Sequence, residues 1–320
     1  MGKICIDLSL SNIWRSWYLF EKGKKKTFQL EKFQYYLEDN LINLYDQLSS
    51  GTYKHGGFRS FTVSDSKRRN IAVASISDRV VHRLIYEYLV DLFDKTFIFD
   101  AWSCRKNKGI CGAIQRTHFF MKKYKTGFVW RSDIRKFFDS VNQNNLKQFL
   151  FRKVKCVRAQ QLLCEVIESF PSNMPIGNLT SQIFANIYLN ELDRYIKFEL
   201  RIKGYLRYGD DFVVFDKNRF NLLRNRDKIT NFLMFNLKLE VNKKSDFLVK
   251  TKQGIKFLGV EIFDLGIRLN KRNNFRIIER LERKNIASYC GIAKRCGNKN
   301  TKKIVNWKIL EILENMEKML

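Results

Sequence analysis

The residues best suited to chemistry are acidic, and they stand at two separate places in the chain. Asp133 ends an apolar segment, and Asp210 and Asp211 follow a glycine between two other apolar segments. Clustered carboxylates raise one another's pKa unless a cation lies between them. Hard divalent cations with oxygen ligands are the natural partners of such a cluster. Two Mg²⁺ ions about 3.5–4 Å apart can hold both the attacking and the leaving oxygen of a phosphoryl transfer.

The elements that must position these acids follow from local patterns. Residues 127–134 indicate an apolar strand, and 205–215 indicate a hairpin with Gly-Asp-Asp at its turn. Helical spacing predicts helices within 9–50 and over 78–93, with two short strands, 61–63 and 70–73, between them. Further helices are predicted at 143–155, 158–170, 179–201 and 217–236. Short strands within 255–262 and a helical, basic C-terminal stretch complete the pattern.

The charge of the chain indicates a polyanionic partner. Its 320 residues include 60 Lys and Arg against 32 Asp and Glu, a net charge of +28. Such a surplus favours nucleic acid, because neutralising phosphates releases counterions. An anionic membrane surface is the alternative, and it predicts liposome binding without salt-sensitive RNA binding. No apolar run reaches the roughly 18 residues of a spanning helix, so we expect no membrane partner.

The seven cysteines are irregularly spaced and include no C-x-x-C pair. An odd number of cysteines in a chain of this length predicts reduced thiols in a cytoplasmic protein. Only three histidines occur, and none stands near Cys290 or Cys296, so a zinc site is not expected. The cysteines are interpreted as core residues.

The order of the motifs resembles that of reverse transcriptases. Asp133, Phe137-Phe138, the loop 175–177 with its following helix, the Gly-Asp-Asp turn and the segment 257–259 occur in the order of that family. The resemblance implies an α+β, right-hand polymerase fold. The implied divisions are an N-terminal extension with fingers at 1–120, a palm with an antiparallel sheet at 121–265, and a short helical thumb at 266–320. Finger helices would occupy about 140–175.

Within this resemblance, Asp133, Asp210 and Asp211 match the catalytic metal-binding positions, together with Ile134 directly after the first acid. The implied cofactor is a pair of Mg²⁺ ions. Phe138, five residues after Asp133, matches the steric-gate position, where a bulky ring would exclude a ribose 2′-hydroxyl. Without the motif, Phe138 is interpreted as a core residue.

Other positions match the nucleotide-binding residues of the family. Lys67 and Arg69 match the pair that grips the incoming triphosphate, Lys as a point charge and Arg through paired hydrogen bonds. The alternative for this basic loop is a solvated turn. Lys244 lies where many relatives have a lysine that assists pyrophosphate departure, and adjacent Lys243 leaves the choice between them open. The remaining nucleotide-binding matches are Ile176, Gly177 and Gln182.

A third group of residues is implied to contact primer or template. Arg105 and Lys108 match a second finger motif, and Phe257, Leu258 and Gly259 match the primer grip. In the thumb, helical spacing of arginines forms a cationic stripe that would contact duplex phosphates without reading sequence. The alternative is a solvated helix face. The stripe consists of Arg272, Arg276, Arg280 and Arg283.

The form Ile176-Gly-x-x-x-Ser-Gln182 resembles the reverse transcriptases of diversity-generating retroelements. That resemblance implies template RNA, a primer or cDNA and dNTPs as partners, error-prone copying of adenine, and a small basic helical-bundle accessory protein. Two alternatives remain open. One is a reverse transcriptase of an unassigned or phage-defence lineage, and the other is a catalytically inactive, maturase-like RNA-binding protein.

Overall fold

The computed structural model describes residues 5–64, 68–171, 173–282, 285–297 and 299–317. Two of the predicted site residues, Lys67 and Arg283, lie outside the described residues. No helix in the described ranges combines the length and the apolar character that crossing a membrane requires.

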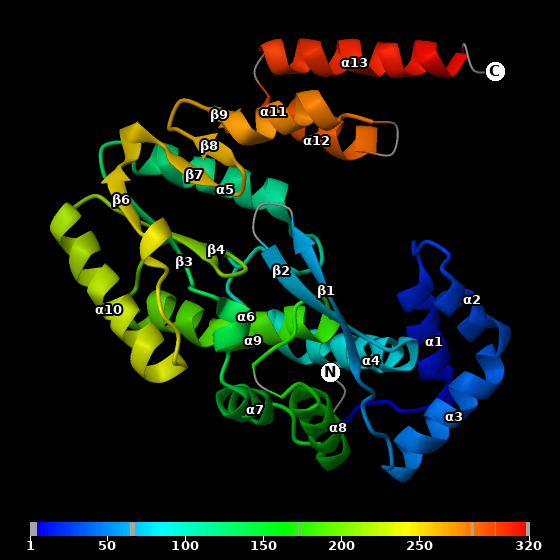
Figure 1. Ribbon diagram of the computed structural model, residues 1–320. Helices are drawn as coiled ribbons and strands as arrows, with labels where there is room; N and C mark the ends of the chain where they lie inside the picture. Colours follow the sequence, from blue (N-terminus) through cyan, green and yellow to red (C-terminus); the bar gives the residue numbers. More distant parts are fainter. Residues whose placement is uncertain (1–4, 65–67, 172, 283–284, 298, 318–320) are drawn as a thin grey trace.

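A four-stranded antiparallel sheet in the order β4-β5-β3-β6 forms the centre of the molecule (Figure 1). Its strands alternate between two cores. Trp130 and Phe212 face one core with α9 and α10, whereas Val129 and Val213 face a second core with α5. Because both faces are covered, apolar residues occur on both faces of the strands, as the sequence predicts for 127–134 and 205–215. The strands are β3 (Phe128–Asp133), β4 (Gly204–Tyr208), β5 (Asp211–Asp216) and β6 (Phe247–Lys250).

The N-terminal part consists of helices and a β-hairpin. The predicted helical stretch 9–50 is three helices, because Thr27 caps a new helix and Tyr36 separates the last two. The hairpin pairs Phe58 with Ala74, so its strands are longer than predicted. The elements are α1 (Leu10–Glu21), α2 (Phe28–Tyr35), α3 (Leu37–Ser50), β1 (Phe58–Ser64), β2 (Arg68–Ala74), α4 (Ile76–Phe93), η1 (Asp94–Thr96) and α5 (Ile110–Lys123).

Between β3 and β4 the chain forms helices that close over one face of the sheet. The helix predicted at 179–201 ends as an α-helix at Arg194 and continues as one π-helical segment. Polar side chains cap several helix starts by accepting a backbone N–H bond, as Asn142 does for α7. The elements are α6 (Phe137–Ser140), α7 (Gln143–Phe151), α8 (Val157–Glu168), α9 (Leu179–Arg194) and η2 (Tyr195–Glu199).

The C-terminal part begins with α10 (Arg219–Leu237) and, after the short turn η3 (Lys243–Ser245), returns along the sheet as β6. A second antiparallel sheet follows, which the sequence predicted only within 255–262. Figure 1 shows it beside α5, with the last three helices stacked beyond it. The elements are η4 (Thr251–Gln253), β7 (Ile255–Phe257), β8 (Val260–Ile262), β9 (Ile267–Leu269), α11 (Lys271–Arg280), α12 (Ile286–Cys296) and α13 (Lys299–Glu317).

The prediction that all cysteines are reduced is wrong for one pair. Cys5 and Cys156 form a disulfide, with their Cα atoms 5.1 Å apart. The two residues are 151 positions apart in sequence, and their pairing depends on the N-terminal segment lying against the start of α8. The spacing of the cysteines along the chain therefore could not predict this disulfide. Cys104, Cys111, Cys164 and Cys290 are free thiols.

Gly127, directly before β3, tests how strictly the position of this strand is fixed. A Cβ atom there would lie 2.4 Å from the Asp216 carbonyl oxygen, so the strand carrying Asp133 would have to shift. We expect Gly127→Ala to lower the free energy of unfolding by about 1–3 kcal/mol, measured by urea denaturation. Gly57→Ala is the control, because no atom lies within 4 Å of its Cβ position. Equal stability of the two variants would contradict the close approach.

Candidate active site

Backbone pairing brings the two acidic segments together. Asp133 at the end of β3 lies directly opposite Asp211 at the start of β5. One residue further, the Ile134 N–H donates to the Asp210 carbonyl oxygen at 3.3 Å. Gly209 adopts a φ of +64°, which permits the two-residue turn between β4 and β5. The predicted hairpin with Gly-Asp-Asp at its turn is therefore confirmed, and 77 positions of sequence separation are closed by one strand pair.

The carboxylates open on a cavity of about 600 Å³. Its lining comes from β2, the end of β3, α6, the loop before α9 and the Gly-Asp-Asp turn. The cavity thus has metal-type ligands on one wall and a basic strand on another. Six of the predicted site residues that the structure describes line it: Arg69, Asp133, Ile134, Phe138, Ile176 and Asp210.

The third acid, Asp211, is placed differently from the other two. Its Oδ1 accepts from Arg131 Nη2 at 2.7 Å, and both side chains are less than 30% exposed. Arg131 precedes Asp133 by two residues, so it lies on the same face of β3 and reaches Asp211 diagonally across the strand pair. The sequence reasoning missed Arg131, although strand alternation places it beside the acids.

Asp133 is held from a third segment. The Ser245 hydroxyl donates to its Oδ1, and the Asn242 N–H donates to its carbonyl oxygen at 2.9 Å. Ile134 forms an isolated bridge with Val241. The segment 241–245 therefore fixes the end of β3 on the side opposite the Asp210 turn. Neither Ser245 nor Asn242 had a sequence signal, because only the fold brings them next to Asp133.

The β1–β2 hairpin is fixed to the loop that precedes α9. The Ala72 N–H donates to the Ile176 carbonyl oxygen, and the Asn178 side chain donates to the Ala72 carbonyl oxygen, both at 2.9 Å. Gly177 has a φ of +114°, and a Cβ there would lie 2.7 Å from Ile71. Only glycine fits this close approach. Arg69 and Ile176 thereby face one cavity, whereas Gln182 is exposed on the first turn of α9.

Phe138 is half-buried, and part of its ring lies on the cavity wall. Its ring meets Phe137 edge-on at 5.3 Å between centroids, and its carbonyl oxygen accepts from the Met174 N–H at 3.0 Å. The neighbouring Phe137 is fully buried. Both phenylalanines line the cavity and contact the core, but Phe138 is the more exposed of the two and is therefore better placed to contact a molecule in the cavity.

Lys244 lies next to this cavity. It is exposed and lines a neighbouring cavity of about 1,230 Å³ between α10 and residues 239–246. Lys243 lines the same space, and Asn242 lines both cavities. The structure therefore leaves the choice between the two lysines open, as the sequence does.

Arg105 and Lys108 make internal contacts. Arg105 is 10% exposed on its side chain and donates to the Asp94 carboxylate and to three backbone carbonyl oxygens. The Lys108 ammonium donates to the Phe99 carbonyl oxygen and lies 4.0 Å from the Trp102 ring centroid. Burial, with repulsion from Arg105, lowers the pKa of Lys108. These contacts favour a role in folding the 97–109 loop, and contact with primer or template stays a prediction.

The predicted primer-grip residues form the turn between β7 and β8. The Phe257 ring is buried in the second core, and Leu258 and Gly259 both have positive φ. The Asn273 side chain donates to the Gly259 carbonyl oxygen at 2.8 Å, which ties this turn to α11. Only the turn itself is therefore placed to meet a ligand.

The predicted arginine stripe begins on α11. Arg272 and Arg280 are exposed there, and Arg276 is half-buried. Since α11 ends at Arg280, the described stripe is one helix of ten residues. A contact of this stripe with duplex phosphates stays a prediction.

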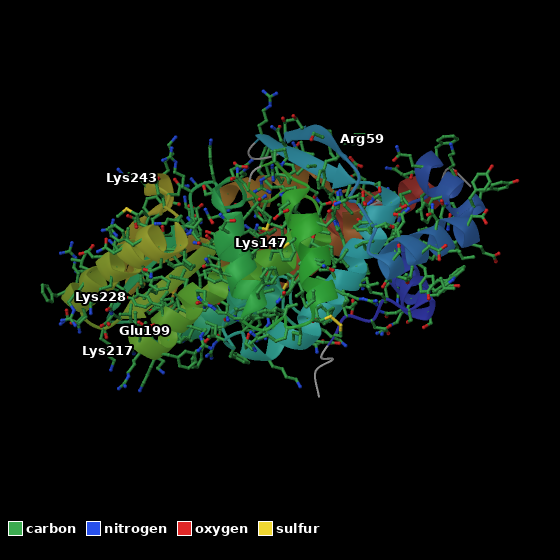
Figure 2. The ribbon with its side chains drawn as sticks, turned by 90° about the horizontal axis from the view of Figure 1, so that it is seen from below. Arg59, Lys147, Glu199, Lys217, Lys228 and Lys243 are labelled. Atoms are coloured by element: carbon green, nitrogen blue, oxygen red, sulfur yellow. A yellow bond between two sulfur atoms is a disulfide. The ribbon has the colours of Figure 1, made fainter. Side chains whose placement is uncertain are left out.

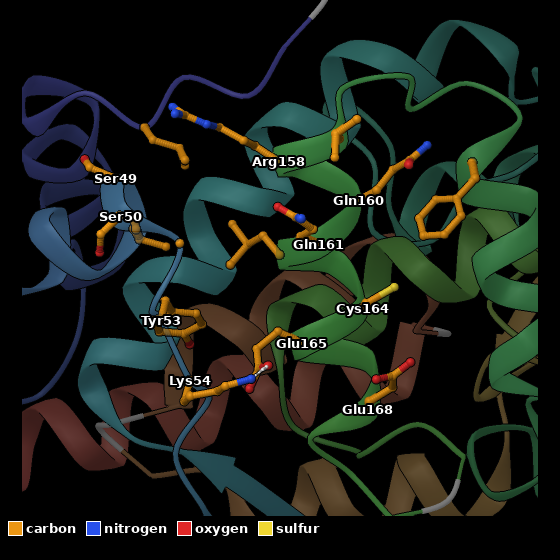
Figure 3. Close-up of a pocket in the computed structure, with 16 residues that line it drawn as sticks. Ser49, Ser50, Tyr53, Lys54, Arg158, Gln160, Gln161, Cys164, Glu165 and Glu168 are labelled. Carbon is orange, nitrogen blue, oxygen red and sulfur yellow. Dashed lines mark hydrogen bonds and ion pairs between the residues drawn. The ribbon is translucent and has the colours of Figure 1, made fainter.

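A further cavity of about 630 Å³ lies between the 48–54 segment and α8 (Figure 3). Lys54 crosses it and pairs with Glu165 at 2.9 Å, while Glu168 pairs with Lys147. Both carboxylates in its lining are therefore neutralised by lysines. The 600 Å³ cavity, where Asp133 and Asp210 meet, is the better candidate for metal-dependent chemistry.

Comparison with known proteins agrees with this geometry. The model of the family described as reverse transcriptase (RNA-dependent DNA polymerase) matches residues 54–262, well over half of the chain. The chain belongs to the reverse transcriptase family. The match includes β2, β3, α9 and the Gly-Asp-Asp turn, which together form the 600 Å³ cavity.

Several curated proteins resemble this reverse transcriptase chain. Protein YkfC of Escherichia coli K12 is 22% identical over 264 residues, covering 68% of this chain and 69% of that protein. The group II intron-encoded protein LtrA of Lactococcus lactis is 18% identical and covers 70% of this chain and 50% of its own length. A putative COX1/OXI3 intron 2 protein of Saccharomyces cerevisiae is 21% identical, with 70% and 32% covered. The chain thus spans half or less of both intron proteins.

Two solved telomerase structures share the fold. Telomerase from Candida albicans, in complex with a fragment of telomeric RNA, aligns with a TM-score of 0.52 over 87% of this chain and 60% of that chain. Apo telomerase from Candida tropicalis aligns with a TM-score of 0.50 over 88% and 63%. Sequence identity is 12% in both cases, so these alignments speak for the fold alone. The predicted α+β, right-hand polymerase fold is confirmed.

The donor set of the cavity suits a hard divalent cation. Within the described ranges, no group of three or more His, Cys, Asp or Glu side chains is gathered as a metal site. Asp133 and Asp210 nevertheless line one cavity. Mg²⁺ is commonly held by one or two carboxylates together with waters and substrate phosphates. Reverse transcriptase domains generally use divalent metal ions, and Asp133 and Asp210 are the residues that would hold them here.

Arg131→Met tests the neutralisation of Asp211. Without the guanidinium, Asp211 would lose this ion pair while still lying opposite Asp133, and we expect the free energy of unfolding in EDTA to fall by about 1–3 kcal/mol. Added Mg²⁺ should recover more stability in the variant than in the wild type. Arg135→Met is the control, because the Arg135–Glu240 pair is about two-thirds exposed and should contribute less than about 1 kcal/mol. A loss that Mg²⁺ leaves unchanged would contradict this account.

Proposed function

We propose that this chain is an RNA-directed DNA polymerase that adds dNTPs to a primer 3′ end in a Mg²⁺-dependent reaction. The observation that carries the proposal is the shared cavity of Asp133, Asp210, Arg69 and Phe138. The two acids can bind a divalent cation, Arg69 can bind a triphosphate, and the Phe138 ring lies at the cavity wall. Membership of the reverse transcriptase family supports the same reaction.

We assign a task in this reaction to each predicted site residue in or beside the cavity. Asp133 and Asp210 would hold two Mg²⁺ ions, with Asp211 and Ile134 in support. Bound Mg²⁺ supplies Lewis acidity that activates the primer hydroxyl and offsets charge on the pyrophosphate. Arg69 would bind the triphosphate through paired hydrogen bonds. The Phe138 ring would exclude a ribose 2′-hydroxyl, and Lys244 would protonate the departing pyrophosphate.

The template and primer would lie across a basic surface. The net charge of +28 favours a polyanionic partner, and Figure 2 shows Lys217, Lys228 and Lys243 pointing outward near α10. The C. albicans telomerase structure contains telomeric RNA, which supports RNA as a partner by analogy. We assign fingers, palm and thumb to 1–120, 121–265 and 266–320, with finger helices at about 140–175. A small basic helical-bundle accessory protein completes the proposed set of partners.

Asp210→Asn tests the polymerase assignment. Removing one metal-binding charge should cost several kcal/mol of transition-state stabilisation, and primer extension on an RNA template should fall at least about 10³-fold. Asp91→Asn is the control, because Asp91 is exposed on α4 and the change in charge is the same. Retained extension by Asp210→Asn would refute the assignment of this acid.

The subtype is a second part of the proposal. The Ile176-Gly177 form supports the reverse transcriptases of diversity-generating retroelements, which copy a template with errors opposite adenine. Ile176 lines the cavity and has no polar group to contact a base pair. The shape and pairing of the nascent base pair would then be checked less strictly beside Ile176. A reverse transcriptase of an unassigned or phage-defence lineage is the alternative, and an inactive, maturase-like protein would bind RNA without extending a primer.

Fidelity separates these subtypes. Wild-type protein should misincorporate more often opposite adenine than opposite the other template bases, as read by sequencing cDNA. Ile176→Gln should reduce the adenine errors about fivefold, because one hydrogen bond contributes about 1 kcal/mol. Ile110→Gln is the matched control on an exposed position of α5. Equal error rates at all four template bases would exclude the diversity-generating subtype while leaving the polymerase assignment intact.

A further inference from the structure

Arg207 is a fully buried charged residue next to the Gly-Asp-Asp turn. It lies on β4, two residues before Gly209, and is 1% exposed. Its Nε and Nη2 donate to the two carboxylate oxygens of Asp193 at 2.8 and 2.6 Å. Its Nη1 donates to the Gly209 carbonyl oxygen at 3.0 Å and to the Asn186 side chain at 3.2 Å. One guanidinium thus joins α9 to the backbone of the turn.

The bond to Gly209 has a direct consequence for Asp210. The Gly209 carbonyl belongs to the peptide group that precedes Asp210, and Arg207 fixes it. The peptide group that follows Asp210 is fixed by the Ile134 N–H, which donates to the Asp210 carbonyl oxygen. Both peptide planes around this acid are therefore restrained. These two bonds restrain the backbone that carries the Asp210 side chain, which lines the 600 Å³ cavity.

The frame behind Arg207 is rigid. Asp193 is fully buried on α9, and the Tyr205 hydroxyl also donates to its Oδ1 at 2.7 Å. Asn186, on the same helix, donates to the Ser103 carbonyl oxygen at 2.8 Å. Burial opposes the charge on Arg207, but the Asp193 carboxylate outweighs it, so the pKa of the guanidinium is raised. Because α9 starts at the loop holding Ile176, one helix supports two walls of the cavity.

Stability alone gives a weak reason for this buried pair. Apolar residues of similar volume often replace a buried ion pair without loss of stability, because desolvating two charges is costly. What an apolar pair lacks is a donor for the Gly209 carbonyl. Lysine cannot replace Arg207 either. Its ammonium is a single point charge, whereas the planar guanidinium donates to Asp193 and to Gly209 at the same time.

We propose that Arg207, held by Asp193, is a positioning residue that aims Asp210 at the cation-binding cavity. This inference rests on the metal-binding role proposed for Asp210, and its kinetic test rests in addition on the proposed polymerase activity. In structural terms, metal binding by Asp210 then depends on the Arg207 side chain, which touches neither metal nor substrate.

Arg207→Lys is the principal variant. It keeps the charge beside Asp193 but loses the bond to Gly209. We expect kcat for primer extension to fall about 10- to 100-fold, the effect of a misplaced catalytic group, while the KM for dNTP stays unchanged. The rise in melting temperature when Mg²⁺ is added without substrate should shrink as well. Tyr205→Phe is the matched control, because it removes another hydrogen bond to Asp193 but none to the turn. It should lower stability and leave kcat and the Mg²⁺ response intact.

A double variant guards against loss of folding. Arg207→Met with Asp193→Leu removes both charges, so no unpaired charge stays buried. It should fold, yet show the low kcat and weak Mg²⁺ response of Arg207→Lys. Wild-type kcat and Mg²⁺ response in either variant would overturn the inference. If the wild type itself extends no primer, the proposed function fails, whereas the Mg²⁺ shift in melting temperature still decides whether Arg207 positions Asp210.

Discussion

Repulsion among three carboxylates where the two central strands of a sheet end is the constraint on which the rest of this structure depends. Like charges directly opposite one another destabilise a strand pair, and Asp133 lies directly opposite Asp211. Arg131 offsets this repulsion by pairing with Asp211, and the Ser245 hydroxyl donates to Asp133. Asp133 and Asp210 face the cavity, where a divalent cation can neutralise their charges. The unfavourable part of the arrangement is thus also the part proposed to bind metal.

Such a cluster needs a stiff support, and the central sheet provides it from both sides. Its strands bury alternate residues in two separate cores, so a shift in register would move every side chain to the wrong core. Helix α9 adds a second constraint, because it supports the loop at Ile176 by its start and the Gly-Asp-Asp turn through Asp193 and Arg207. The wall of the cavity at Ile176 and the wall at Asp210 therefore share one supporting helix.

Local patterns predicted the strands at 127–134 and 205–215 well, since apolar runs bounded by turn residues have few other stable forms. The resemblance to reverse transcriptases then named six residues that the structure gathers in one cavity. Prediction was weaker where a side chain has competing partners. Arg105 fits a motif for primer or template contact, yet its donors are engaged by Asp94 and nearby carbonyls. Phe257 fits the primer grip, but its ring is buried and only the turn beyond it is open.

The sequence by itself determined the large positive charge, the strands that end in acids and the order of motifs, because charge, hydrophobic periodicity and turn chemistry are local properties. Only the tertiary structure decided that Asp211 pairs with Arg131, that Ser245 reaches Asp133, and that Arg207 bonds the turn from inside. The disulfide between Cys5 and Cys156, which are 151 positions apart, is another contact that only the tertiary structure decided. Contacts between distant segments depend on how helices and strands pack, and no spacing along the chain encodes which of several donors reaches a given acceptor.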